Sequence, residues 1–579
     1  MEKRVLLAVI LSFIVLVASQ VLFPPRKPPA FDTTPPQGSA GPAGATPPET
    51  SPVAAGAPGA DAPSQAPDSL ERPRATVAAA QEQDVVVDSP QVHAVFSTRG
   101  ATLKSWRLKN YHDDTGEPLE LVPTAVPNPA RPFTLTADDP AISATLRGAL
   151  FKPGVETLTI ASPSTLTFEY RDEAGLAATK QFSFNPERPY EVVFSASVIR
   201  DGAPVRTTIE MGPSLGTGVI GGGMTYNPPP QPVFYRAGDA TRLSSDDISD
   251  RRAEEGDFNF VGVDDHYFLT AAVETKAARV EYRPVRVAVA GSEKGLQFID
   301  WSIRYPEGVN ESRFFLGPKD FDALRAISPE MTYAIDFGMF RWLVVPLLNA
   351  LKWVHGYLGN YGWSIIALTV LINVAMFPLR HKSVVSMRKM QEIQPEVKAI
   401  QDRYAKLKMS DPARQKMNVE MMNLYRERGV NPASGCVPML LTFPVLFAFY
   451  AMLSVAIEIR GAPFIGWIRD LAAHDPLFIW PVIMGITMVI QQKMTPTAMT
   501  DPIQQRMMML MPIVFSVMLA WAPSGLVLYW TASNVWTIGQ QALTNKLIGP
   551  PPQHTVRPPA ERRLKTAGSG KSPQAKERK

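Results

Sequence analysis

Polar side chains recur at helical spacing within apolar segments of this sequence. Thr369 and Asn373 are four residues apart in one such segment, and Thr442 lies in another. A further set follows a 4-3-4 spacing and consists of Trp530, Asn534, Thr537 and Gln541. Residues at these intervals share one face of a helix. Their hydroxyl, amide and indole groups can bond neighbouring helices or offer hydrogen bonds to a polar guest segment, and Thr442 alone favours the first.

Other chemistry-bearing residues are not arranged as a catalytic or metal centre. The single cysteine, Cys436, excludes an intramolecular disulfide and a cysteine-cluster metal site. Six of the seven histidines show no metal-ligand spacing, and they are His93, His112, His266, His355, His381 and His474. No pair of nucleophile and base can be inferred either. We therefore predict that the chain is not an enzyme and has no catalytic residue, metal or cofactor.

Length and composition indicate several domains, part of them in a membrane. A chain of 579 residues is too long for one ordinary domain and is enough for two or three. Charged residues make up only 19% of it, against 45% hydrophobic residues and 23 methionines. This balance, with its long apolar runs, favours a partly membrane-embedded protein over a large soluble enzyme.

Six apolar segments are candidates to span a bilayer. Residues 5–23 follow Lys3 and Arg4 and are long enough to span. We expect an uncleaved anchor at 1–23, the alternative being a secretory signal cleaved near Ala18. The other segments lie at about 361–379, 435–457, 476–492, 507–522 and 525–541. The last three are only about 15–17 residues long, or ~22–26 Å of helix, so local thinning of the bilayer is expected.

Basic residues predict the orientation of these spans. Residues 380–428 hold 12 Lys and Arg against 6 Asp and Glu, and the tail 546–579 holds 9 against 2. The positive-inside rule places both segments in the cytoplasm, together with the N-terminus. Six spans bring the C-terminus back to the side of the N-terminus. The large segment between the first two spans is therefore predicted to be exported.

The exported part divides into a linker and a β domain. Residues 24–83 are dense in Pro, Ala, Gly and Ser and are typical of an extended linker. In 84–330, short stretches rich in β-branched and aromatic residues alternate with turn residues, which predicts an all-β antiparallel sandwich. A short helix at 319–327 is expected to close the domain. Residues 338–356 are amphipathic and predict a helix in the outer membrane interface before the second span.

Between the second and third spans the sequence predicts a helical hairpin at 382–428. Apolar residues recur at steps of three and four on both sides of a turn at 409–414, as in an antiparallel coiled coil. Its basic residues include Arg388, Lys389, Lys398, Arg403, Lys406 and Lys408. They are typical either of a solvated link between spans or of a docking arm, and the charge pattern does not choose between them.

Several ordered stretches from the second span onward carry a family resemblance. They are GWSII at 362–366 with FPL at 377–379, then MRKMQEIQPEVKAIQ, NPASGCVPMLLTFPVLFAFYAML, QQKMTPT, DPIQQRMMMLMPIVF and PSGLVLYWTASNVWTIGQQ. Together they resemble the YidC/Oxa family of membrane protein insertases, and the resemblance covers about 330–545. An N-terminal anchor followed by a large exported β domain is similar to the Gram-negative YidC type.

The resemblance implies a chaperone that inserts and helps to fold inner-membrane proteins, alone or with the Sec translocon. It implies a core of five spans at 357–545 around a hydrophilic groove, and an exported domain similar to a β-supersandwich. The expected groove residues are Thr369, Asn373, Thr442, Trp530 and Asn534. Of these, Thr369, Asn373 and Trp530 match the substrate-contacting positions of the family.

The resemblance also implies partners and a location. The expected partners are nascent membrane proteins, the Sec translocon, membrane lipids and the ribosome. The basic tail 546–579 is compositionally disordered and could meet ribosomal RNA together with the hairpin, or serve only as a topology anchor. The implied location is a bacterial inner membrane, with a periplasmic β domain and with both termini in the cytoplasm.

One position departs from the family pattern. A basic residue is usual in the second span, where this chain has Asn373. Asn keeps hydrogen-bonding capacity but supplies no positive charge to attract acidic residues. Arg380 is seven residues on, two turns along much the same face, and is expected at the cytoplasmic mouth of the groove. Thr442 stands where Gln is common, so a less polar groove is expected.

Two other classes of function stay open. A transporter would be expected to have internal repeats and charged residues inside its spans, which this sequence does not display. A membrane-anchored periplasmic sandwich that binds carbohydrate would need paired carboxylates in a cleft. Asp113–Asp114 and Asp264–Asp265 are adjacent carboxylates in the β domain, but adjacent carboxylates in a strand or loop usually point apart, so the signal is weak.

Overall fold

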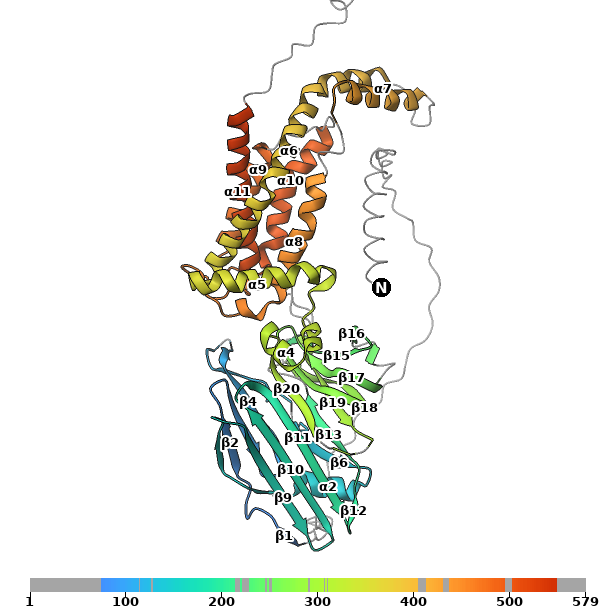
Figure 1. The fold of residues 1–579 in the computed structure, drawn as a ribbon, viewed down its shortest axis with the longest axis vertical. Coiled ribbons are helices and arrows are strands. Elements are labelled where there is room, and N and C mark those ends of the chain that lie inside the picture. The colour runs from blue at the N-terminus through green and yellow to red at the C-terminus, as the bar shows by residue number, and fades with distance from the viewer. Residues whose placement is uncertain are drawn as a thin grey trace, which may run out of the picture. The chain divides into compact units, whose positions relative to one another are not determined.

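The computed structural model describes residues 74–548 apart from 114, 127–128, 214–218, 221–228, 245–246, 249–251, 290–291, 307, 310, 405–412, 431–436 and 495–501. The predicted anchor at 1–23, the predicted linker as far as residue 73 and the tail beyond residue 548 lie outside these residues. Figure 1 shows a β domain that is followed along the chain by a group of helices.

The β domain contains one large and one small sheet. The main path of the 15-stranded sheet runs β1 (Ala75–Val77), β9 (Ser164–Asp172), β10 (Leu176–Asn185), β11 (Arg188–Arg200), β20 (Ser312–Pro318), β18 (Phe268–Val289), β17 (Ala253–Asp264), β15 (Gln231–Arg236) and β16 (Asp239–Arg242). Its other strands are β6 (Thr134–Ala137), β7 (Lys152–Pro153), β12 (Ala203–Pro204), β13 (Thr207–Pro213), β14 (Val219–Ile220) and β19 (Ser292–Arg304). The five-stranded sheet runs β5 (Pro118–Glu120), β4 (Thr102–His112), β3 (Val92–Ser97), β2 (Asp84–Asp88) and β8 (Thr157–Thr159). Every pairing between described strands is antiparallel except that of β2 with β8, which confirms the predicted antiparallel β domain.

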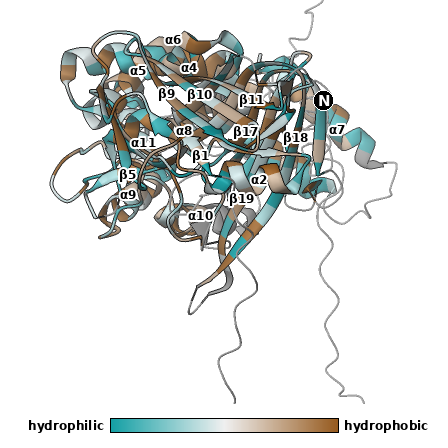
Figure 2. Cartoon of the chain, turned by 90° about the horizontal axis from the view of Figure 1, so that it is seen from below, coloured by the Kyte–Doolittle hydropathy of each residue, from teal (hydrophilic) through white to brown (hydrophobic). Residues whose placement is uncertain are grey.

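The two sheets pack face to face through aromatic side chains. Phe96 of β3 contacts Phe182 of β10 with ring centroids 4.7 Å apart. Trp106 of β4 donates its indole N–H to the Leu316 carbonyl of β20 at 3.0 Å. Side chains along β10 alternate between buried and more exposed positions, and Figure 2 shows brown and teal alternating along the strands. This is the period of two expected of a strand that places one face on a core.

The ends of the β domain differ in part from the predictions. The linker does not extend to residue 83, because β1 lies within it and pairs with β9. A helix that was not predicted, α2 (Pro140–Gly148), begins where the Asp139 side chain accepts the Ala141 N–H and Pro140 follows. The expected closing helix is present as α4 (Phe321–Ile327).

A lysine lies inside the aromatic core of the β domain. Lys180 of β10 is fully buried, and its Nζ donates to the carbonyls of Gly100, Ala101 and Phe133 at 2.6, 3.2 and 2.7 Å. Three acceptors match the three N–H groups of an ammonium. No described carboxylate forms an ion pair with it, and burial lowers the pKa of Lys180 to about 7.

We expect this lysine to make stability depend on pH. An unfolded chain holds the Lys180 proton up to about pH 10.4, whereas the folded chain releases it at about pH 7. Between these values the unfolded state binds more protons, so the free energy of unfolding rises with pH. Lys180→Met should remove this rise in thermal unfolding of the full chain in detergent, while exposed Lys276→Met should keep it. Parallel pH profiles for the wild type and Lys180→Met would contradict this assignment.

The later part of the described chain is helical. Its helices are α5 (Arg341–Leu358), α6 (Tyr361–Tyr404), α7 (Ala413–Glu427), α8 (Val437–Val455), α9 (Ile479–Met494), α10 (Pro502–Met518) and α11 (Ser524–Ile548). α6 contacts α5, α8 and α11, and α9 contacts α10 and α11. Among the described helices, α6 alone is long and apolar enough to cross a membrane by length and composition. Phe443–Val455 and Met509–Trp521 are shorter apolar helices.

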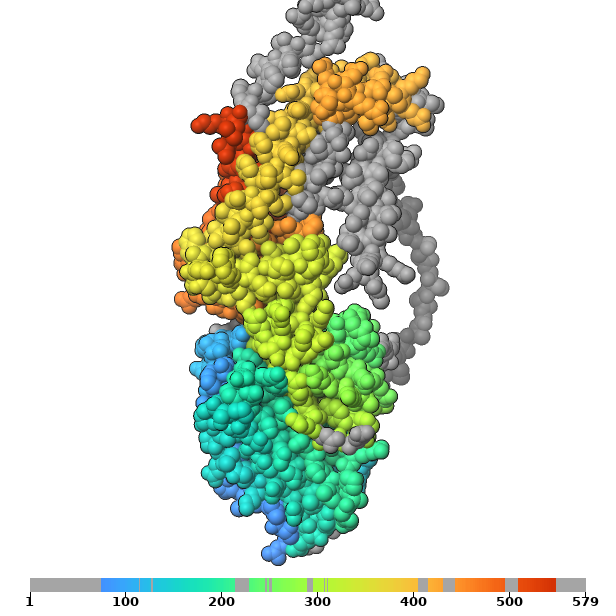
Figure 3. All heavy atoms as spheres, in the orientation of Figure 1, coloured from blue at the N-terminus to red at the C-terminus, as the bar shows by residue number. Residues whose placement is uncertain are grey.

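α6 continues well past its apolar part and packs there against α7. Ile393, Val397 and Ile400 of α6 are buried together with Leu424 of α7. The spacing of three and four residues on α6 is that of a coiled-coil seam. Arg428 pairs with Glu396 across the contact at 2.6 Å. Figure 3 shows α7 in orange beside the yellow end of α6.

Polar contacts join the β domain to the helices. His266, between β17 and β18, donates its Nε2–H to the Ser454 carbonyl of α8 at 2.7 Å. Burial lowers the pKa of His266 to about 4, so the ring is neutral at physiological pH. Lys352 of α5 contacts the carboxylates of Asp322 in α4 and of Glu458, the latter at 3.5 Å. These bonds hold the β domain to α5 and to the end of α8.

Candidate functional site

The helical group exposes large apolar side chains and buries polar side chains among apolar ones. Its exposed large hydrophobic residues include Leu371, Val374, Phe447, Val482, Ile486, Met509, Ile513, Val517 and Val535. Its buried polar residues include Ser364, Thr369, Asn373, Thr531, Asn534, Gln540, Gln541 and Thr544. A soluble domain arranges its residues the other way round. Apolar surface of this extent suits helices surrounded by lipid, with polar contacts between them.

Two of the predicted groove residues lie on the buried side of α6. Thr369 is fully buried, and Asn373 is 4% exposed. The Thr369 hydroxyl donates to the Ile365 carbonyl at 2.6 Å, and Asn373 Nδ2 donates to the Thr369 carbonyl at 2.8 Å. These bonds use the backbone of the same helix. No hydrogen bond to Asn373 Oδ1 is found within the described part of the chain, so this oxygen is available as an acceptor.

On α11 the predicted polar residues face α6 and α9. Asn534 Nδ2 donates to the Thr487 hydroxyl of α9 at 3.1 Å. Three residues on, Thr537 accepts a hydrogen bond from Arg380 of α6 at 3.1 Å. Gln541, four residues further, is also buried. The 4-3-4 spacing thus marks the side of α11 that meets its neighbours.

Arg380 has no counter-ion among the residues that the structure describes. Its side chain is half-buried, and its guanidinium reaches Thr537 rather than a carboxylate. Arg388, two turns further along α6, bonds to Asn545 of α11 at 2.5 Å. A guanidinium stays protonated in proteins, so Arg380 keeps a positive charge at this end of the polar face.

A set of buried polar atoms in the second half of α11 was not predicted from the sequence. Gln540 Oε1, Thr544 Oγ1 and Trp536 Nε1 are buried without a hydrogen-bond partner in the described chain. Such an atom costs about 1–3 kcal/mol if nothing satisfies it, so water or a polar guest would be stabilised there. Thr544 follows Gln541 by three residues. The 4-3-4 spacing, continued by one more step, would therefore have predicted Thr544 on the same face of the helix.

Trp530 lies among apolar side chains. Its ring contacts Phe515 of α10, with centroids 4.8 Å apart. It also lines a largely apolar cavity of about 1070 Å³, to which α8 contributes Tyr450 and α10 contributes Met511. The sequence spacing predicted that Trp530 and Asn534 share one environment. In the structure Trp530 instead faces α10, whereas Asn534 faces α9.

The other predicted residues are Thr442 and the basic residues of the hairpin, and the structure describes only some of them. Thr442 belongs to α8, but its side chain is outside the described set. Lys406 and Lys408 also lie outside it. The hairpin residues that are described are Arg388, which is half-buried, and Lys389, Lys398 and Arg403, which are exposed.

Of the two carboxylate pairs considered for a carbohydrate site, Asp264–Asp265 is engaged in structural contacts, and Asp114 of the other pair lies outside the described residues. Asp264 pairs with Lys319 at 3.1 Å and with Arg242 at 3.3 Å. Asp265 accepts the backbone N–H groups two and three residues on, at 2.8 and 2.6 Å. Among the described residues, no group of three or more His, Cys, Asp or Glu side chains could hold a metal ion.

Comparison with known proteins gives a match for each half of the chain. The YidC periplasmic domain matches residues 84–350, and the 60Kd inner membrane protein family matches residues 353–550. A protein of Geobacter sulfurreducens named membrane protein insertase YidC is 37% identical over 481 residues, which are 80% of this chain and 86% of that protein. The protein of the same name in Geobacter metallireducens is 35% identical over 577 residues, which are 95% of this chain and 99% of that protein. The chain belongs to the YidC family.

Structural comparison adds a solved YidC-family structure to these relatives. It is an active YidC insertase with its first transmembrane domain resolved, and it aligns with 81% of this chain and 93% of its own. The sequence identity is 18%, and the TM-score is 0.33. The sequence relatives therefore carry the assignment to the YidC family.

In this YidC-family chain, neighbouring residues of α11 should differ in their access to water. We expect Asn534→Cys, at a position 5% exposed, to react with a charged, membrane-impermeant thiol reagent in native membranes. Val535→Cys, at a position 56% exposed, should resist the reagent if α11 spans the membrane with this side in lipid, because a thiolate forms only where water reaches the sulfur. Both variants would carry Cys436→Ser. Faster labelling of Val535→Cys would contradict a polar interior.

Proposed function

We propose that this chain inserts membrane proteins into a bacterial inner membrane and helps them to fold. The observation that carries the proposal is a polar face between α6, α9 and α11 within an apolar outer surface. The Geobacter relatives are named membrane protein insertases, which supports the same activity here. No catalytic residue or cofactor is part of the proposal.

The polar face lowers the barrier for a polar segment that must pass through lipid. The hydrocarbon layer is about 30 Å thick, and each unsatisfied polar group costs several kcal/mol in it. Asn373 Oδ1 has no partner among the described residues, and neither have the buried atoms Gln540 Oε1 and Thr544 Oγ1. A guest segment can exchange bonds to water for bonds to these acceptors.

Arg380 supplies the positive charge that Asn373 lacks. It is half-buried beside Thr537 and has no described carboxylate as partner. A carboxylate on an incoming segment would therefore gain a charge-assisted hydrogen bond without displacing an existing ion pair. In this proposal Asn373 provides hydrogen bonding, and Arg380 attracts acidic residues from one end of the groove.

Short helices support a locally thin bilayer. α9 and α10 have 16 and 17 residues, or about 24–26 Å of helix. This is less than a typical hydrocarbon layer, which thins beside short spans. The predicted last span at 525–541 lies within α11, which has 25 residues and continues to Ile548. Its last turns bond to α6 through Asn545, which extends the helix beyond its apolar part.

The proposed topology has six spans and a periplasmic β domain. The anchor at 5–23 and the apolar helices α6, α8, α9, α10 and α11 would cross the membrane, with both termini in the cytoplasm. Trp342, Trp353 and Tyr357 are exposed on α5. Aromatic residues of this kind favour the membrane interface, so α5 would lie along the outer surface.

The proposed partners follow from the same arrangement. Nascent membrane proteins would occupy the groove, and lipids would cover the apolar outside. The exposed Lys389, Lys398 and Arg403 make the hairpin a basic surface for ribosomes. Cooperation with the Sec translocon is proposed from the family resemblance alone.

Depletion of the protein tests the proposed activity. A small two-span test protein would be assayed by protease protection in membrane vesicles after depletion. We expect insertion to fail and to be restored by the full chain. Restoration by a version without most of 84–320 would assign the activity to the helices. Normal insertion after depletion would contradict the proposal.

Substitutions at Asn373 and Arg380 should separate hydrogen bonding from charge in the same assay. Asn373→Leu should slow insertion of segments with polar exported ends several-fold, and Asn373→Arg should keep it. Arg380→Gln should slow acidic segments more than neutral ones, and Arg380→Lys should keep both. Exposed Val374→Leu is the matched control. Full activity of Asn373→Leu would remove Asn373 from the mechanism, and equal losses for acidic and neutral segments would remove the charge of Arg380.

A further inference from the structure

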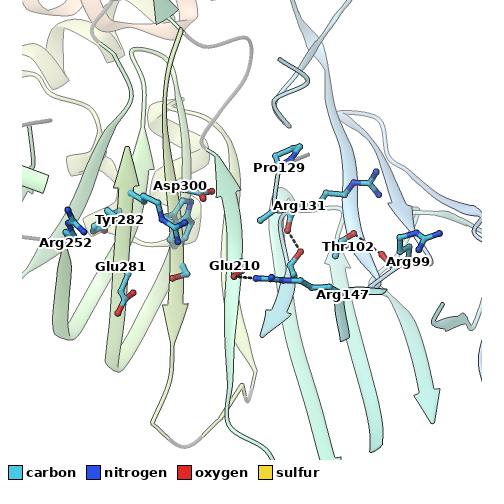
Figure 4. Close-up of a pocket in the computed structure, with 15 residues that line it drawn as sticks. Arg99, Thr102, Pro129, Arg131, Arg147, Glu210, Arg252, Glu281, Tyr282 and Asp300 are labelled. Carbon is cyan, nitrogen blue, oxygen red and sulfur yellow. Dashed lines mark hydrogen bonds and ion pairs between the residues drawn. The ribbon is translucent and has the colours of Figure 1, made fainter. Parts of the chain in front are cut away.

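The β domain contains a cleft of about 740 Å³ that the proposed groove does not use. Figure 4 shows residues of β13, β18 and β19 on one side and residues around α2 and the turn between β3 and β4 on the other. Glu210 of β13 lies in the middle, where Arg147 of α2 reaches it at 2.6 Å. The cleft is therefore built from both sheets of the domain.

Arginines outnumber carboxylates in this cleft. The arginines are Arg99, Arg131, Arg147, Arg252 and Arg283, and the carboxylates are Glu210, Glu281 and Asp300. Glu82 pairs with Arg99 at 2.7 Å. No described carboxylate lies within ion-pair distance of Arg131, Arg252 or Arg283, so the lining has positive charge to spare.

The arginines are spread along the cleft rather than gathered at one point. In Figure 4, Arg252 lies at one end and Arg99 at the other, with Arg131 between them. A single phosphate or carboxylate would meet only one or two of these guanidinium groups. An extended ligand with several separated negative charges would meet more of them.

Acceptors in the same lining favour a ligand that also carries N–H groups. Asp300 of β19 is the cross-strand partner of Arg283 on β18, yet no hydrogen bond to its carboxylate is found among the described residues. Its Oδ1 and Glu210 Oε2 are buried without a partner. A free phosphate has only O–H groups to donate and carries its charge at a single point. A peptide offers both backbone N–H groups and, on Asp or Glu, separated carboxylates.

We propose that this cleft binds an extended acidic peptide segment, and that the segment is an exported part of a membrane protein during its insertion. The second part rests on the proposed insertase function. By the positive-inside rule, exported segments are poor in Lys and Arg, so those that carry Asp or Glu are net acidic. Surplus arginines would retain such a segment and disfavour a basic one.

Peptide binding to the full chain in lipid nanodiscs tests the cleft. The probe is a short fluorescent peptide with Glu at alternate positions, followed by anisotropy, beside its Gln counterpart. We expect the Glu peptide to bind more tightly and to weaken with salt. Arg131→Gln with Arg283→Gln should lower its affinity about tenfold, which corresponds to two exposed ion pairs. Arg171→Gln with Arg325→Gln, which removes two exposed arginines elsewhere in the domain, should leave it unchanged.

Three results would overturn the cleft proposal. They are equal binding of the Glu and Gln peptides, unchanged binding by the cleft variant, and displacement by inorganic phosphate at the peptide's own concentration, which would mean a single-anion site.

Insertion of two test proteins, one with an acidic and one with a neutral exported segment, separates this proposal from the insertase function. The cleft variant should slow only the acidic one. If the wild-type chain inserts neither, the insertase function fails. If it inserts both while the peptide does not bind, the cleft proposal fails alone.

Discussion

The helical part of this protein is governed by the requirement that polar groups inside lipid have hydrogen-bond partners. Thr369 meets it through its own helix, and Asn534 meets it through Thr487 on the next one. Arg380 meets it through Thr537. The requirement is left open at the end of α11, where Gln540 and other buried polar residues lack a partner in the described chain. In the proposed groove, a polar segment of a substrate would form hydrogen bonds with such unpaired groups.

The β domain contains both paired and unpaired buried polar atoms, and it is bound to the helices by charges. Inside it, Lys180 has three carbonyl acceptors. At the junction, Lys352 of α5 lies near Glu458, whose pKa burial raises. Removing one partner of a buried ion pair usually costs more than the pair contributes. The orientation of α5 and the outer end of α8 therefore depends on contacts with the β domain.

Local patterns predicted most of the secondary structure. Period-two alternation predicted strands such as β10, because one face of a strand meets the core and the other meets solvent. Spacing of three and four residues predicted the seam formed by Ile393, Val397 and Ile400. The pattern was too weak for β1 and α2, since a strand of 3 residues and a helix of 9 contain little periodicity.

Contacts between distant residues could not be predicted in this way. Arg380 and Thr537 are 157 positions apart, and no local pattern indicates that the two side chains meet. Trp530 shows the converse, because its spacing matched Asn534 while its environment was set by Phe515 of another helix. Spacing identifies which residues share a face of one helix. The tertiary packing decides which element covers each turn of that face.

The sequence by itself determined the alternation of apolar and polar segments, the side of the membrane that basic residues favour, and the family to which the chain belongs. These properties depend on neighbouring residues and on composition. Only the tertiary structure decided that Arg380 lies beside α11 without a carboxylate among the described residues, and that arginines from five parts of the β domain line one cleft. The physical reason is that charge pairing depends on distance in space, which folding sets after the local pattern is complete.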